Sequence, residues 1–231
     1  GIFAGGRRLF LKGVNWSPVP VGSSATKGGP QYRGFAKTDS ALMSALGANA
    51  VRTYGPLTDL DVLDVLWRRG IYVLNTVYIS SNDTIDSVAL SVRAVMHHPS
   101  ILMWVVGNEW NYNKLYSGMD SERALSRVAE VAQLIKAIDQ THPVATVYGM
   151  LPKRAQVESL RHVDVWGIIA YTGISFGDLF ADWSRLSKKP MFVAEFGADA
   201  YNAKANAVDE GDQALAVGAL TKEIVAHSVH R

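Results

Sequence analysis

The sequence HPSILMWVVGNEW, residues 98–110, decides the fold class of this chain. Pro99 ends any helix that precedes it, because proline cannot continue the helical hydrogen-bond pattern. Six apolar residues follow at 101–106 without polar alternation, which predicts a strand buried on both faces, as in a parallel sheet covered by helices. Asn108 and Glu109 come just after this strand, and ligands of α/β proteins bind at the carboxyl ends of such strands. We therefore expect a functional site there.

The same strand-then-helix pattern recurs along the chain in units of about 30 residues. Strand-like runs stand at residues 9–16, 49–54, 71–78, 101–106, 143–148, 163–171 and 190–197. A segment with helical periodicity follows each run, which makes seven β-then-α units with right-handed crossovers. Eight such units form a (β/α)8 TIM barrel, and the even spacing and polar strand ends favour this α/β fold over an open doubly wound sheet.

No break in composition divides the chain, so we expect residues 1–231 to form a single (β/α) barrel catalytic domain. An eighth strand is not evident: either it falls outside this sequence, or it lies where the pattern does not reveal it. Residues 17–34 are rich in proline and glycine and predict a long loop, which could wall a cleft.

Composition excludes several classes of function. Apolar residues make up 48% of the chain and charged residues 19%, which allows a large core and argues against disorder. The net charge of +2 is too balanced to indicate binding to nucleic acid or to a membrane surface. The chain has no cysteine, so it forms no disulfide or thiolate metal site, and no apolar run reaches the roughly 18 residues of a membrane span. The cellular location stays undecided.

Two glutamates, Glu109 and Glu195, each end an apolar run and each precede an aromatic residue. In a closed barrel both would face the same central mouth. A pair of carboxyl groups there is the equipment for glycoside hydrolysis, in which one group serves as acid and base and the other as nucleophile or water activator. The alternative for each is an ordinary solvated residue at a strand end.

The residues around the two glutamates resemble those of a known group of enzymes. GNEW at 107–110 and AEFGAD at 194–199 resemble the acid/base and nucleophile motifs of clan A glycoside hydrolases. Those proteins are (β/α)8 enzymes that act on β-linked sugars with retention of configuration. The resemblance implies the same fold and chemistry here, with no cofactor or metal and with an oligosaccharide or polysaccharide as substrate.

Longer segments narrow the resemblance to families within that clan. MHHPSILMWVVGNEW at 96–110 and KPMFVAEFGADA at 189–200 resemble the catalytic domain of glycoside hydrolase family 2. LKGVNWSPVPVG at 11–22, LGANAVRTYGP at 46–56 and RGIYVLN at 69–75 are similar to that family and equally to the fungal β-1,3-glucanosyltransferases of family 72.

The resemblance implies a role for five residues. Glu109 would be the general acid/base and Glu195 the nucleophile, and Asn108 would form a hydrogen bond with the sugar 2-hydroxyl group. Arg52 would keep the nucleophile ionised, and Tyr171 would donate a hydrogen bond to it. Electrostatics agrees, because a positive charge and a phenol donor favour a carboxylate, whereas an acid needs apolar surroundings. A structural salt bridge for Arg52 and plain packing for Tyr171 are the alternatives.

Further residues lie at or just past strand ends, where aromatic faces could stack on sugar rings or could simply pack in the core or rim. They are Asn15, Trp16, Tyr54, Tyr78, Trp110 and Tyr201. Clan members usually offer a tryptophan from strand eight as well, and this sequence shows no such strand.

We therefore predict a retaining β-glycosidase or transglycosylase that works by double displacement, with the two carboxyl groups about 5–5.5 Å apart. A non-catalytic sugar-binding barrel is the main alternative. Metal-dependent hydrolysis is a second one, but it needs clustered ligands, and the adjacent His97 and His98 would point about 100° apart on a helix.

Overall fold

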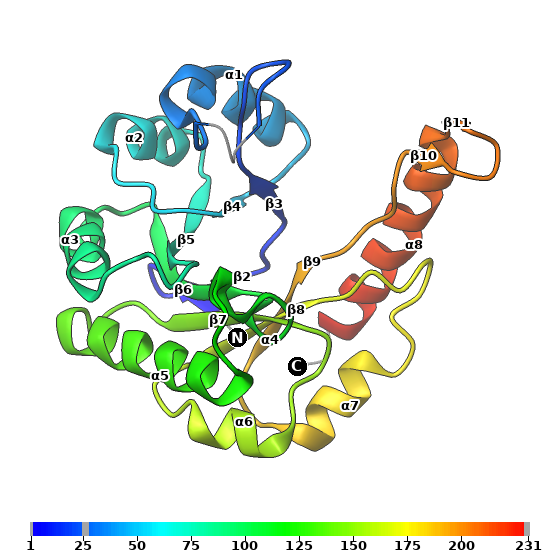
Figure 1. Cartoon of the computed structure of the whole chain (residues 1–231). Coiled ribbons are helices and arrows are strands. Elements are labelled where there is room, and N and C mark those ends of the chain that lie inside the picture. The colour runs from blue at the N-terminus through cyan, green and yellow to red at the C-terminus, as the bar shows by residue number, and fades with distance from the viewer. Residues whose placement is uncertain (1, 25–27, 229–231) are drawn as a thin grey trace.

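A computed structural model describes residues 2–24 and 28–228 (Figure 1). Seven parallel strands form one sheet whose order follows the chain. The strands are β3 (Gly13–Trp16), β4 (Ala50–Thr53), β5 (Tyr72–Tyr78), β6 (Ile101–Asn108), β7 (Val144–Gly149), β8 (Val165–Ile169) and β9 (Met191–Glu195). A doubly wound sheet reverses its strand order, so this topology confirms the predicted barrel class.

The sheet curls until its first and last strands meet at their carboxyl ends. Asn15 on β3 donates from Nδ2 to the carbonyl oxygen of Ala194 on β9, at 3.1 Å. The result is a nearly closed barrel of seven strands, and within the described residues no eighth strand joins the sheet. The seam between β3 and β9 is therefore bridged by a side chain rather than by a ladder of backbone hydrogen bonds.

Helices lie around the outside of this curved sheet, except for the short helix at residues 110–113, which lies at the carboxyl end of β7 (Figure 1). They are α1 (Tyr32–Ala45), α2 (Leu60–Arg68), α3 (Ile85–Val95), α4 (Trp110–Asn113), η2 (Lys114–Tyr116), α5 (Ser121–Ile138), α6 (Arg154–Ser159), α7 (Leu179–Leu186) and α8 (Glu210–Ser228). Asp59, Thr84 and Asp120 cap α2, α3 and α5 by accepting hydrogen bonds from their first backbone N–H groups. No helix among the described residues is long and apolar enough to cross a bilayer.

The strands bury both faces, which explains their unbroken apolar runs. Val51 and Val106 belong to a large core between the sheet and the helices. Val105, Val147 and Ile169 belong to a smaller core inside the barrel. Successive side chains of a strand point to opposite faces of the sheet. A residue in the core inside the barrel therefore has neighbours that point toward the helices, and the reverse also holds.

The chain begins differently from the prediction of one strand over 9–16. A hairpin of β1 (Ile2–Ala4) and β2 (Arg7–Leu9) comes first, and Ile2 and Leu9 pack against the core inside the barrel. The first barrel strand starts only at Gly13. The loop predicted at 17–34 is also shorter, because α1 already begins at Tyr32. Residues 25–27 lie outside the described part of the chain.

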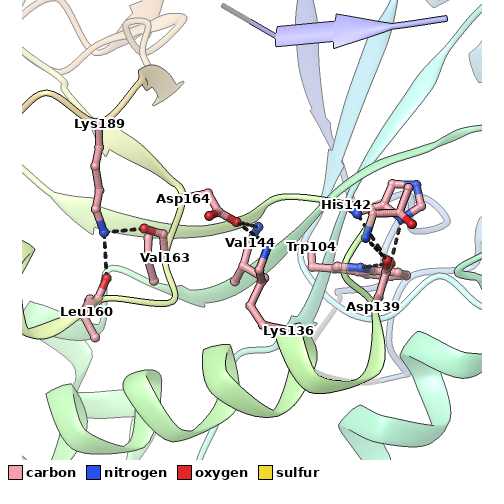
Figure 2. Close-up of polar contacts among 10 residues, drawn as sticks. Trp104, Lys136, Asp139, His142, Val144, Leu160, Val163, Asp164 and Lys189 are labelled. Carbon is pink, nitrogen blue, oxygen red and sulfur yellow. Dashed lines mark hydrogen bonds and ion pairs between the residues drawn. The ribbon is translucent and has the colours of Figure 1, made fainter.

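Polar side chains fasten the amino ends of the strands (Figure 2). Asp139 accepts hydrogen bonds from Trp104 Nε1 at 2.8 Å and, where the histidine tautomer carries the proton, from His142 Nδ1 at 2.7 Å. Asp164 accepts one from the backbone N–H of Val144. Lys189 donates to two backbone carbonyl groups of the loop before β8. These contacts connect loops to strands at the end of the barrel opposite to Glu109 and Glu195.

Candidate active site

Arg52 is the centre of the site at the carboxyl ends of the strands. It stands two residues after Ala50, a member of the core inside the barrel, so its side chain also points inward. Its guanidinium group donates to Asn15 Oδ1 at 2.8 Å and to Asn108 Oδ1 at 2.9 Å, and it forms an ion pair with Glu195 Oε1. Only 4% of the Arg52 side chain is exposed, and its charge-assisted hydrogen bonds connect its own strand to three others.

Glu195 receives two phenol donors besides Arg52. Tyr54 donates to Oε1 at 2.8 Å, and Tyr171 donates to Oε2 at 3.1 Å. Burial, followed by the charge of Glu195, raises the pKa of Tyr171 to about 12, and burial is also the main cause of the raised pKa of Tyr54. Both phenols therefore keep their protons at neutral pH, and the three donors together stabilise the charged carboxylate of Glu195.

Glu109 is the carboxyl group of the site whose pKa is raised. Burial raises its pKa, the negative charge of Glu195 raises it further, and Arg52 opposes both effects. The two carboxyl groups are thus near enough to influence each other. A carboxyl group with a raised pKa can hold a proton and donate it, and acid-assisted glycoside cleavage needs such a donor.

A bulge in β6 sets the direction of Asn108. The register between β6 and β7 shifts between Val106 and Asn108, and Gly107 between them has φ +75°. A Cβ atom on Gly107 would lie 2.6 Å from Trp110 Cδ1, so only glycine fits. Because of this extra residue, Asn108 turns inward to Arg52, which occupies its amide oxygen and leaves Nδ2 as the group that could donate to a sugar hydroxyl.

The backbone of Glu109 is strained and held in place by its neighbours. Its φ of +46° lies in the left-handed region, which costs a residue other than glycine about 1–3 kcal/mol. The N–H of Glu109 donates to the carbonyl oxygen of Val147 at 3.1 Å, and Trp110 Nε1 donates to Thr146 Oγ1 at 2.9 Å. Such strain is common at functional sites, where surrounding contacts fix one conformation.

Three predicted stacking residues do not reach the mouth of the barrel. Trp16, Tyr78 and Trp110 are buried in the core between the sheet and the helices, with at most 4% exposed. Trp16, for example, packs on Tyr32 and donates to Asp39. The prediction of an exposed stacking face is wrong for these three, because position after a strand does not say to which side a ring turns.

Three other predicted residues occupy definite places. Asn15 supports Arg52 and bridges to β9. Tyr54 is a hydrogen-bond donor to Glu195, and its ring lies 4.5 Å from the guanidinium carbon of Arg52. Tyr201 is in the small hairpin of β10 (Tyr201–Asn202) and β11 (Ala207–Val208) beside one end of α8, where it bonds to Asn206 (Figure 1). Side chains alternate along a strand, so Tyr54, two residues after Arg52, points to the same side of the sheet. This spacing was the sequence signal for its position beside Glu195.

A hollow of about 390 Å³ opens beside Tyr171, and Gly197, Ala198 and Asp199 form its other main wall just after Glu195. Among the described residues, no group of three or more histidine, aspartate or glutamate side chains could hold a metal ion. The site consists of two carboxyl groups, an arginine, two phenols and an amide, and the hollow adjoins it at Tyr171.

The (β/α) barrel fold, together with these side chains at the carboxyl ends of its strands, is typical of clan A glycoside hydrolases. Comparison with known proteins specifies the family. The model of the glycosyl hydrolases family 2 TIM barrel domain matches residues 80–212, and the chain belongs to this family.

Individual relatives agree with that assignment. A β-glucuronidase of Rattus norvegicus is 26% identical over 187 residues, which are 70% of this chain and 27% of the relative. This chain therefore spans about a quarter of the length of such curated relatives.

Solved structures resemble the fold of this chain. The β-D-glucuronidase of Dictyoglomus thermophilum has a TM-score of 0.64 at 20% identity, covering 84% of this chain and 38% of that one. Bacteroides uniformis β-glucuronidase 2, covalently bound to cyclophellitol-6-carboxylate aziridine, has a TM-score of 0.65 at 17% identity, covering 93% and 29%.

Proposed function

We propose that residues 1–231 are the catalytic barrel of a retaining glycosidase that cleaves β-linked glycans. The observation that carries this proposal is the contrast between the two carboxyl groups. Glu195 is surrounded by Arg52, Tyr54 and Tyr171, whereas the pKa of Glu109 is raised by burial and by Glu195. Family membership supports the same chemistry.

The reaction has two halves. In the first, Glu195 attacks the anomeric carbon, the bond from that carbon to the leaving oxygen breaks, and Glu109 transfers its proton to this oxygen. In the second, Glu109 accepts a proton from water, the water oxygen attacks the anomeric carbon, and the ester bond to Glu195 breaks. We expect Asn108 Nδ2, whose amide oxygen is held by Arg52, to donate to the 2-hydroxyl group, a contact that strengthens in the transition state.

We also propose which sugar the site accepts beside Tyr171. The relatives named above are β-glucuronidases, so a β-glucuronide is the first substrate to try. If a sugar hydroxyl replaces water in the second half, the products are those of a transglycosylase, and the segments similar to the family 72 glucanosyltransferases are the only support for that outcome.

The test is a panel of 4-nitrophenyl β-glycosides (glucuronide, glucoside, galactoside and mannoside), with product analysis to separate hydrolysis from transfer. The Glu195→Gly variant should lose turnover. Added azide should restore turnover with a glycosyl azide as the product, because the small anion replaces the missing carboxylate. A Glu158→Gly variant on the exposed surface of α6 is the control and should stay active without azide.

The stereochemistry is a second test. A carboxyl separation of about 5–5.5 Å predicts that the first product, observed by NMR, is the β-anomer, whereas a separation near 8 Å would give inversion. Glycan binding without any turnover by the wild-type protein would instead establish a non-catalytic sugar-binding barrel.

A further inference from the structure

The short helix α4 is clipped to the end of β7. Asn111 donates from Nδ2 to the carbonyl oxygen of Gly149 at 2.9 Å, and the N–H of Gly149 donates to Asn111 Oδ1, also at 2.9 Å. The amide side chain thus pairs with Gly149 as a neighbouring strand would. Because α4 follows Glu109 directly, this clip fixes the position of the segment next to the acid/base carboxyl group.

The ring of Tyr112 lies over the inward side of Gly149. Val147 belongs to the core inside the barrel and Tyr148 to the outer core, so position 149 points inward, at the mouth. A Cβ atom on Gly149 would lie 2.2 Å from Tyr112 Cε2 and 2.7 Å from Cδ2. Glycine at 149 therefore makes the room that the aromatic ring fills.

Most of this ring is nevertheless open to solvent. Tyr112 is 62% exposed, and the neighbouring Met150 is 49% exposed, so the ring is supported on the Gly149 side and free elsewhere. The N–H of Tyr112 donates to the carbonyl oxygen of Glu109 at 2.8 Å, which keeps the two residues in one turn. A fixed, uncharged aromatic surface offers a large contact area without losing much conformational entropy when a ligand binds.

We propose that Tyr112 is a stacking platform for a neutral pyranose ring on the leaving-group side of the scissile bond. The inference rests on the proposed function, because Glu109 protonates the leaving oxygen and the sugar attached to that oxygen must lie on the Glu109 side. The apolar C–H face of the leaving sugar packs on the Tyr112 ring, and the same surface receives a sugar acceptor in the second half of the reaction.

The experiment compares two substrates of the sugar preferred in the aryl glycoside panel. One is its methyl β-glycoside, whose leaving group is too small to cover the ring, and the other is the disaccharide in which that sugar is β-1,4-linked to glucose. Tyr112→Ala should lower kcat/KM for the disaccharide about fivefold to tenfold and change the methyl glycoside less than twofold. Tyr112→Phe should behave as wild type, because it keeps the ring.

A matched control is Phe3→Ala, which removes another exposed aromatic side chain, in the hairpin of β1 and β2, and should change neither substrate. An equal loss on both substrates with Tyr112→Ala would overturn the platform and assign the ring a structural role, and no loss on either would overturn it too. If the wild-type protein cleaves no substrate of the panel, the proposed function fails. Calorimetric titration of wild type and Tyr112→Ala with cellobiose then tests the platform, and equal affinity of the two overturns it.

Discussion

The two ends of the barrel both contain buried charged groups, but they use them in opposite ways. At the amino end, Asp139 accepts hydrogen bonds from Trp104 and from two backbone N–H groups, and it is also paired with His142 (Figure 2). Burial alone would raise the pKa of Asp139, yet these contacts lower it. At the carboxyl end, burial and Glu195 raise the pKa of Glu109.

The direction of each shift says what the group does for folding. A carboxyl group with a lowered pKa in the folded protein stabilises it above the ordinary pKa, and this stabilisation is lost as the pH falls through the folded-state value. A carboxyl group with a raised pKa destabilises the folded protein once the pH is high enough to ionise it. The amino end therefore serves stability, and the carboxyl end keeps a destabilising group that chemistry requires.

The largest expected effect separates the two ends most clearly. Glu109→Gln should lower kcat/KM for substrates with poor leaving groups by about 10²–10⁴, since it removes general acid and base catalysis. The same variant should unfold at an equal or higher temperature at pH 7, because an uncharged amide replaces a carboxylate that is disfavoured there. Steady-state kinetics and calorimetry measure the two effects, with Glu158→Gln as a surface control. A drop in melting temperature would show that Glu109 is needed for the fold.

The converse variant is Asp139→Asn at the amino end. The asparagine amide has one oxygen that accepts hydrogen bonds, whereas the aspartate carboxylate has two, so a donor is left unpaired. The free energy of unfolding should therefore fall by about 1–3 kcal/mol at pH 7. Activity should change less than twofold. Urea unfolding should show the difference from wild type shrinking as the pH falls below 3.8, the ordinary pKa of the group. A difference independent of pH would mean that the charge of Asp139 contributes nothing.

Much of this architecture can be read from the sequence, for a physical reason. Strands buried on both faces have unbroken apolar runs, and the polar residues that end them must meet at one edge of a parallel sheet. Arg52 and Tyr171 contact Glu195 at the mouth, and the charge of Glu195 acts on Glu109.

What the sequence did not reveal depends on the side to which a residue turns. The bulge at Gly107 shifts the alternation by one residue, and a register shift in β9 does the same before Glu195. A pattern of apolar residues does not show where such shifts occur, so Trp110, which follows the bulge, could be placed after its strand but not assigned to a side. The hairpin at residues 2–9 was missed because its strands have only three residues each.

The smallest expected effect concerns the outer of the two phenols at Glu195. Tyr171 is 61% exposed and its hydrogen bond is 3.1 Å long, whereas Tyr54 donates at 2.8 Å and also packs on Arg52. Tyr171→Phe should therefore lower kcat/KM about fivefold, less than Tyr54→Phe, because a well-solvated hydrogen bond to a charged group contributes little. Its melting temperature should stay within one degree or so of wild type, since the phenol adds little to packing at an exposed site.

Kinetics on one aryl glycoside and calorimetry of both tyrosine variants check these values. If Tyr171→Phe destabilised the protein as much as Asp139→Asn does, the carboxyl end would also contribute to stability through its polar groups. The proposed division between a stabilising amino end and a catalytic carboxyl end would then be wrong. Only the azide experiment would still distinguish a catalytic role of Glu195 from a role in folding.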